Sequence, residues 1–316
     1  MPIAPVMAQR HSPAPSSETT IEAPGPQGPL SGTFRDAGPG APIVLMIPGS
    51  GPTDRDGNSP YGIRAASQRL LAEGLADRRI SSVRVDKRGL FGSRTAVADP
   101  NAVTIGDYAA DVHGWVEVIR ARTGAPCVWV LGHSEGGLVA LAAAQAPEGI
   151  CGLVLVAAPG RPLDTLILEQ IGGNPATAPL VDAASAAIDA VKAGKDLDPE
   201  TLPPAFRTLF ARPIQPYLRD MFAQDPAALA HAYTGPILIV QGGRDIQVRA
   251  ADANALHAAA VRSRLLLIPT MNHVLKTVDS DDRGANVAAY ADPDLPLAPG
   301  VVDGIAGFID EKANRQ

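Results

Sequence analysis

The chain has 316 residues, 46% of them hydrophobic and 19% charged, which is enough for one large α/β domain or two small ones. Its formal net charge of −6 gives no electrostatic basis for binding nucleic acid or an anionic membrane surface. No apolar run approaches the roughly 20 residues that a membrane-spanning helix needs, so we expect no membrane span.

Residues 1–18 are rich in Pro, Ser and Ala, a composition typical of disordered segments. The first nine residues are too short for a signal peptide and lack its positively charged n-region. Val6-Met7-Ala8 followed by Gln9 nevertheless resembles the end of a signal peptide. The sequence therefore leaves the compartment open between the cytoplasm and the periplasm or the exterior.

Short apolar runs alternate with amphipathic segments along the rest of the chain. We predict strands at 19–23, 30–36, 42–47, 82–85, 127–131, 152–157, 236–240 and 264–268. We predict helices at 64–77, 104–122, 138–144, 250–261 and 301–312. This alternation predicts an α/β fold with a mainly parallel, doubly wound sheet. A continuous apolar run such as 42–47 is typical of a central strand that is covered on both faces.

The segment 160–232 breaks this alternation. It contains several helical stretches and the prolines at 203, 204 and 213, and it is too long for a simple crossover between strands. We expect a helical insertion that forms a cap or lid over the C-terminal edge of the sheet. The α/β core would then comprise 19–159 and 233–316.

Gly132-His133-Ser134-Glu135-Gly136 joins an apolar strand to an Ala/Leu-rich helix. This G-x-S-x-G pattern is typical of a nucleophile elbow, in which the serine hydroxyl is exposed on a sharp strand-to-helix turn. Side chains at 132 and 136 would collide across such a turn. An ordinary turn with a helix-capping serine is the alternative. We predict that Ser134 is a nucleophile.

A serine nucleophile needs a base and an acid that orients the base, and in this topology they follow in the order Ser, acid, His. His273 lies after the last predicted strand, whereas His257 lies within a helix and His231 ends the insertion. We predict His273 as the base. Asp245 follows the preceding strand and is the predicted acid, with Asp252, expected on a helix surface, as the alternative.

An oxyanion hole needs two backbone N–H groups. We expect one from Glu135, which follows the nucleophile, and the other from Ser50, in the loop after the strand 42–47. The small neighbours of Ser50 would let the backbone approach a substrate.

These motifs together resemble those of an α/β-hydrolase, and specifically of bacterial serine carboxylesterases with Gly-Ser-Gly-Pro-Thr-Asp-Arg-Asp-Gly-Asn after the third strand. The matching segments are 49–58, 86–89, 132–137, 242–245 and 272–273, in family order. The resemblance implies Ser134, Asp245 and His273 as the catalytic triad, no metal and no organic cofactor. Pro48, where many hydrolases have His, and Phe91, where many relatives carry a smaller residue, depart from the family pattern.

Other charged residues and the cysteines have less specific interpretations. We expect Asp54, Arg55 and Asp56 to form an ion-pair network, with Arg88 as a candidate partner, that rigidifies the oxyanion loop; binding of a metal or of substrate is the alternative. We expect Glu135 to contact that loop or to line the pocket. A solvated loop is expected for Lys276, Asp279, Asp281, Asp282 and Arg283. Cys127 and Cys151 are expected to be two separate buried residues, with a disulfide as the alternative in an oxidising compartment.

The expected function is hydrolysis of a small-molecule ester with a small to medium acyl group, through an acyl-enzyme. A thioesterase, amidase or acyltransferase would use the same triad, and a catalytically silent binding module is the alternative from another class. The candidate substrate-binding residues are Gly51, Phe91, Phe206, Phe210, Tyr217, Met221 and Phe222.

Overall fold

The computed structural model describes residues 17–313. The disorder expected for 1–18 therefore lies outside the described residues, except at Ser17 and Glu18, where the expectation is wrong. Both belong to strand β1 (Ser17–Ala23), which pairs antiparallel with β2 (Leu30–Asp36). The Glu18 carboxylate also accepts a hydrogen bond from Arg84 at 2.9 Å, which fixes this end of the strand.

Eight strands form one sheet in the order β1-β2-β4-β3-β5-β6-β7-β8. The other strands are β3 (Ile43–Ile47), β4 (Ser81–Val85), β5 (Val128–His133), β6 (Ile150–Val156), β7 (Ile237–Gly242) and β8 (Arg264–Ile268). Strand β2 pairs antiparallel with both of its neighbours, β1 and β4. All the other pairings in the sheet, from β4 across to β8, are parallel. The predicted α/β fold with a mainly parallel sheet is confirmed.

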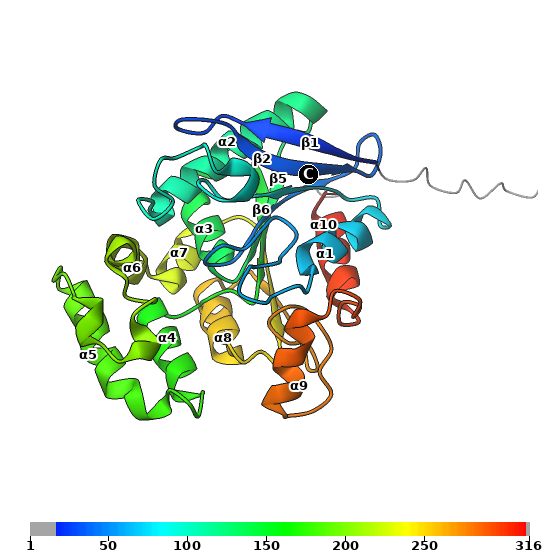
Figure 1. The fold of residues 1–316 in the computed structure, drawn as a ribbon. Helices are drawn as coiled ribbons and strands as arrows, with labels where there is room; N and C mark the ends of the chain where they lie inside the picture. The colour runs from blue at the N-terminus through cyan, green and yellow to red at the C-terminus, as the bar shows by residue number, and fades with distance from the viewer. Residues whose placement is uncertain (1–16, 314–316) are drawn as a thin grey trace, which may run out of the picture.

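Helices cover both faces of this sheet (Figure 1). Helices α1 (Ser67–Ala76) and α10 (Val301–Ala313) lie on one face, and α2 (Ile105–Thr123), α3 (Glu135–Ala143) and α8 (Ala250–Ala259) lie on the other. Successive residues of a strand point to opposite faces, so Val44 packs in the core beneath α1 and α10, whereas Leu45 packs beneath α2 and α3. Burial on both faces explains why the central strands are continuous apolar runs.

The chain between β6 and β7 contains helices α4 (Leu163–Gly172), α5 (Val181–Lys192), α6 (Gln215–Phe222) and α7 (Pro226–Ala232). Figure 1 shows α4, α5 and α6 grouped to one side of the sheet. Helix α7 instead packs against α3 and α8 of the core. A further short helix, α9 (Arg283–Ala288), lies between β8 and α10 and was not predicted.

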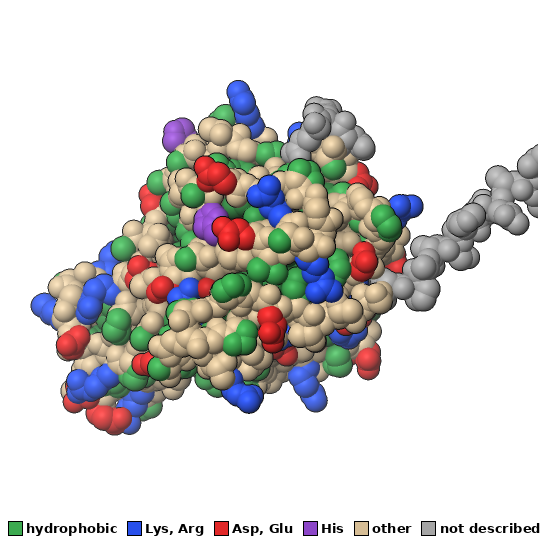
Figure 2. Space-filling model, turned by 90° about the horizontal axis from the view of Figure 1, so that it is seen from above, with side chains coloured by type: hydrophobic (Ala, Val, Ile, Leu, Met, Phe, Trp, Pro, Cys, Tyr) green, Lys and Arg blue, Asp and Glu red, His purple; other side chains and the backbone are tan. Residues whose placement is uncertain are grey.

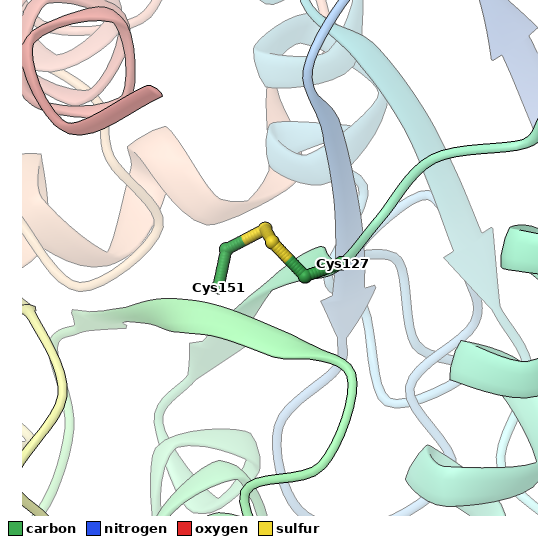
Figure 3. Close-up of a disulfide and its surroundings, with 2 residues drawn as sticks. All are labelled: Cys127 and Cys151. Atoms are coloured by element: carbon green, nitrogen blue, oxygen red, sulfur yellow. A yellow bond between two sulfur atoms is a disulfide. The ribbon is translucent and has the colours of Figure 1, made fainter. Parts of the chain in front are cut away.

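A disulfide joins Cys127, directly before β5, to Cys151 in β6 (Figure 3). The two strands are parallel neighbours, and their cysteine Cα atoms are 5.1 Å apart. The expectation of two separate buried cysteines is therefore wrong, and the alternative is what the structure contains. The bond lies at the N-terminal ends of the strands, at the edge of the sheet opposite to Ser134.

Charged side chains of both signs are interspersed on the face of the molecule in Figure 2. This distribution leaves no extended region of a single charge on that face. Among residues 17–313, no helix combines the length and the apolar character needed to cross a bilayer.

Candidate active site

Ser134 lies between the end of β5 and the start of α3, with φ 54° and ψ −124°. A positive φ is strained for a serine, and such strain is concentrated at functional sites. Gly132 is required here because a Cβ at that position would lie 2.0 Å from the carbonyl oxygen of Gly136. The local structure is thus a sharp strand-to-helix turn, and the Ser134 side chain does not cap the helix.

Ser134 lines a cavity of about 560 Å³ between the core and the insertion. Ser50, Gly51, Lys87, Tyr108 and Glu135 line it from the core. The insertion contributes mainly aliphatic and aromatic side chains: Leu163, Leu166, Ile167, Leu209, Ile214, Tyr217, Leu218 and Met221. The arrangement is typical of a small-molecule site, which is concave and mostly apolar.

The predicted acid and base are in direct contact. Asp245 Oδ2 lies 2.8 Å from Nδ1 of His273, and both side chains are buried. Asp245 Oδ1 accepts hydrogen bonds from the backbone N–H groups of Gln247, at 2.8 Å, and Val248, at 2.9 Å. These bonds fix the carboxylate, which can therefore hold the imidazole in one orientation.

His133 connects this pair to the turn that carries Ser134. Its Nε2 lies 2.8 Å from the carbonyl oxygen of His273, and the centroids of the two rings are 4.9 Å apart. Burial lowers the pKa of His133 to about 4, so this ring is neutral at pH 7 and donates from Nε2. The Ser134 hydroxyl itself makes no hydrogen bond within residues 17–313; in unliganded enzymes such catalytic bonds often form only with substrate.

The alternative acid and bases lie elsewhere. Asp252 is buried, contrary to the expected position on a helix surface, and its Oδ2 pairs with Arg161 at 2.8 Å. It thereby holds the start of the insertion. His257 contacts the Ser263 hydroxyl at 2.8 Å, and His231 contacts the carbonyl of Ala259.

The two residues predicted to donate to an oxyanion, Ser50 and Glu135, line the same cavity as Ser134. Within the described chain, neither the Ser50 nor the Glu135 backbone N–H donates to a protein acceptor. Gly49 lies directly against Ser134, since a Cβ at position 49 would be 3.2 Å from Cβ of Ser134. Lys87 Nζ donates both to the Gly49 carbonyl, at 2.8 Å, and to Glu135 Oε1, at 3.0 Å. Glu135 thus lines the cavity and also contacts the Gly49 loop through Lys87, a connection that was not predicted from the sequence.

The charged loop 49–58, which is predicted to contribute to an oxyanion hole and is called the oxyanion loop here, forms ion pairs, but not with the expected partner. Arg55 Nε donates to Asp86 at 3.0 Å, and Arg84 Nε donates to Asp56 Oδ1 at 3.0 Å. The prediction for Arg88 is wrong, because its guanidinium instead donates to Asp111 and Asp107 of α2. No group of three or more potential metal ligands occurs among residues 17–313.

The loop after His273 is only partly solvated. Asp279, Asp281, Asp282 and Arg283 are exposed, as expected. The prediction for Lys276 is wrong: its side chain is buried, its Nζ donates to the carbonyl of Leu295, and burial lowers its pKa to about 8.

Helix α9 supports the same loop. The Asn286 side chain donates to the Arg244 carbonyl at 2.7 Å and lies 3.4 Å from Nδ2 of Asn272. It therefore connects the immediate neighbours of Asp245 and His273. Asn286 was not predicted from the sequence, because α9 has only six residues and no periodic apolar pattern.

Three of the seven candidate substrate-binding residues, Gly51, Tyr217 and Met221, line the cavity. The other four, Phe91, Phe206, Phe210 and Phe222, do not. Phe206 and Phe210 pack edge to face inside the insertion, with centroids 6.4 Å apart, and Phe222 is buried in the same core. Phe91 is 39% exposed, and its neighbour Leu90 lines the cavity in its place.

Comparisons with known proteins agree with this architecture. Residues 44–290 match the model of the alpha/beta hydrolase family. The chain is similar to esterase EstD of Thermotoga maritima, with 28% identity over 239 residues that cover 74% of this chain and 54% of EstD. The chain thus spans about half the length of that curated relative.

Two solved esterases have a similar fold. Est1E from Butyrivibrio proteoclasticus superposes with a TM-score of 0.58 at 16% identity, covering 93% of this chain and 99% of Est1E. The Pyrococcus furiosus esterase Pf2001 gives 0.56 at 15% identity, covering 94% of this chain and 93% of Pf2001. At these identities the likeness concerns the fold. With a family model matched over most of its length, the chain belongs to the alpha/beta hydrolase family.

Proposed function

We propose that this protein is a serine hydrolase of the carboxylesterase type, which cleaves carboxylic esters with small to medium acyl groups. The observation that carries the proposal is the Asp245–His273 pair, at 2.8 Å. The backbone carbonyl of His273 is hydrogen-bonded to His133, which directly precedes a serine held with positive φ at a cavity wall. The similarity to EstD, which is named as an esterase, supports the same reaction class.

In the proposed reaction, the Ser134 hydroxyl attacks the ester carbonyl while His273 Nε2 accepts its proton. Asp245 holds the Nδ1–H side of the ring and stabilises the imidazolium that forms. The N–H groups of Ser50 and Glu135 stabilise the negative oxygen of the tetrahedral intermediate. His273 then protonates the leaving alcohol, and water hydrolyses the acyl-enzyme by the same steps in reverse.

The segment 160–232 acts in this proposal as a cap that sets substrate size. Ten of its residues line the cavity that Ser134 also lines, and eight of the ten carry aliphatic or aromatic side chains. A cavity of about 560 Å³ accommodates a small molecule rather than a polymer. These two properties support a small-molecule substrate with a small to medium acyl group.

The test is to label the chain with a fluorophosphonate, which reacts with activated serines, and to compare it with Ser134→Ala. Labelling of the parent chain alone is the expected result. Labelling of neither protein would contradict the proposal and favour a silent binding module.

A panel of p-nitrophenyl esters of graded acyl length, with a thioester and an amide of one acyl group, then identifies the reaction class. The esters should be hydrolysed with the highest kcat/KM. A preference for the thioester or the amide would replace the esterase assignment.

A further inference from the structure

Lys87 and Glu135 form a charged pair that is almost completely withdrawn from solvent. Their side chains are 5% and 3% exposed, and Nζ lies 3.0 Å from Oε1. Burying two charges costs several kcal/mol per ion before their attraction is counted, so a buried pair is weak evidence for stability alone. The position of the pair suggests a role in function. Glu135 directly follows Ser134 in the sequence. Lys87 directly follows Asp86, whose carboxylate binds Arg55 of the oxyanion loop.

The second hydrogen bond of Lys87 determines how one peptide of the oxyanion loop is oriented. Nζ donates to the carbonyl oxygen of Gly49 at 2.8 Å. No peptide bond within residues 17–313 is cis, and in a trans peptide the C=O and N–H bonds point in opposite directions. The N–H of Ser50, which belongs to the same peptide as the Gly49 carbonyl, therefore points away from Lys87.

That N–H group is available to a ligand. It has no protein acceptor within the described residues, and Ser50 lines the same cavity as Ser134. If the Gly49–Ser50 peptide rotated by half a turn, a carbonyl oxygen would replace the N–H as the group facing the substrate, and it would repel the developing negative charge.

We propose that Lys87 is a positioning residue for the oxyanion hole, which fixes the Gly49–Ser50 peptide, and that the Glu135 side chain holds Lys87 in place. This inference rests on the proposed function. Glu135 then has two roles, because its own backbone N–H is the second oxyanion donor. The Lys87–Glu135 pair thereby fixes the relative positions of the two donors, the N–H groups of Ser50 and Glu135. The two residues of the pair are 48 positions apart in the sequence.

Two tyrosines enclose the pair. Lys87 Nζ lies 5.2 Å from the ring centroid of Tyr108 on α2, and Tyr217 approaches from α6 of the insertion. Burial and the nearby Glu135 carboxylate raise the pKa of Tyr217 well above its ordinary value, so this hydroxyl stays neutral beside Glu135. The surroundings limit the access of water, which keeps the ammonium group on its two protein acceptors.

The test is the double variant Lys87→Met/Glu135→Gln, which removes both charges and leaves neither one buried alone. The matched control is Arg88→Met/Asp111→Asn. Arg88 is the residue next to Lys87, and its ion pair with Asp111 is also largely buried. This pair holds α2 and does not contact the oxyanion loop. We would measure kcat and KM for a p-nitrophenyl ester, and the affinity for a boronic acid that mimics the tetrahedral intermediate.

The double variant should lose about 100-fold in kcat with KM within about 3-fold, since losing one oxyanion donor typically costs 10²- to 10³-fold. The boronic acid should lose affinity by a similar factor, and the control should keep kcat within about 3-fold. An unchanged kcat, or equal losses in the double variant and the control, would overturn the positioning role. A parent chain that hydrolyses no ester and takes no fluorophosphonate would instead refute the proposed function.

Should the double variant fail to fold, the single variant Glu135→Gln decides. Gln keeps the shape of the side chain and can accept a hydrogen bond, but it releases the charge that holds Lys87. A partial loss of kcat at constant KM supports the inference. A kcat equal to that of the parent chain overturns it.

Discussion

His133 Nε2 donates a hydrogen bond to the backbone carbonyl of His273 at 2.8 Å. The residue directly before the proposed nucleophile thus holds the loop of the proposed base. Removal of this donor in His133→Phe should lower kcat by about 10- to 100-fold, because small misplacements of reacting groups are costly. His133→Gln, whose amide can donate a hydrogen bond from a similar position, should retain a large part of the parent kcat. Equal kcat values for the two variants, measured with one p-nitrophenyl ester, would contradict this role.

The same histidine should make stability depend on pH. Burial lowers the pKa of His133 to about 4, compared with about 6.5 in an unfolded chain. Between these values the unfolded state binds more protons, so the free energy of unfolding falls as pH decreases from about 6.5 to 4. The contribution is roughly 3 kcal/mol above pH 6.5 and is lost towards pH 4.

Urea unfolding of the parent chain and of His133→Phe at pH 7.5, 5.5 and 4.5 measures this contribution. As the pH falls, the free energy of unfolding should decrease more in the parent chain than in His133→Phe. Carboxylates that titrate in both proteins cancel in the difference. Parallel pH curves would show that His133 does not contribute.

Ser134→Ala should abolish ester hydrolysis, with a loss of roughly 10⁴- to 10⁶-fold in kcat. The fold should be retained, because the Ser134 side chain makes no helix-capping hydrogen bond. Circular dichroism and a thermal scan check the fold, and p-nitrophenyl acetate reports the activity. A well-folded variant with a tenth of the parent activity would exclude Ser134 as the nucleophile.

The sequence was sufficient to predict the sheet and the loops that carry the proposed triad. Central strands such as β3 are continuous apolar runs, and in a parallel sheet the loops after successive strands meet at one edge. Asp245 and His273 were placed on such loops and lie in contact. Their catalytic roles, and those of Ser134, Ser50 and Glu135, stay predictions until the variants are measured.

Partners among charged and aromatic residues were harder to predict, because several candidates lay at similar distances along the chain. Arg88 was assigned to the oxyanion loop, yet the neighbouring Lys87 contacts that loop and Arg88 turns to α2. Phe206 and Phe210 were candidate pocket residues, but they pack on each other because the small insertion needs its own core. The partners of these side chains depend on the three-dimensional packing of segments whose apolar residues follow no simple periodic pattern.

Loss of the disulfide should reduce stability but not activity. The bond closes a loop between Cys127 and Cys151, 24 residues apart, and the loop-entropy model gives about 3.5 kcal/mol for such a loop. The six residues of strand β5 separate Cys127 from Ser134, a distance of roughly 23 Å along the extended chain. Cys127→Ser/Cys151→Ser should therefore unfold at lower urea concentration with unchanged kcat. A midpoint equal to that of the oxidised parent chain would contradict this prediction.

Two side chains of the insertion can test the proposal that this segment sets the substrate range. Leu166 of α4 lines the cavity, whereas Ile188 of α5 is buried in the insertion and does not. Leu166→Ala enlarges the cavity on the side opposite to the core, so it should favour longer acyl chains. The expected change is about 10-fold in relative kcat/KM, within the roughly 1–3 kcal/mol by which a pocket discriminates a methylene group.

Ile188→Ala is the matched control, since it removes a buried aliphatic side chain of the same segment at a similar cost of about 2–5 kcal/mol in stability. The two variants would be compared on p-nitrophenyl esters from two to twelve carbons. Only Leu166→Ala should shift the optimum length. A common shift in both variants would mean that loosening the insertion, rather than the shape of the cavity, changes the preference. An unchanged profile in both would move the determinants of specificity to the core side of the cavity, at Gly51, Leu90 and Tyr108.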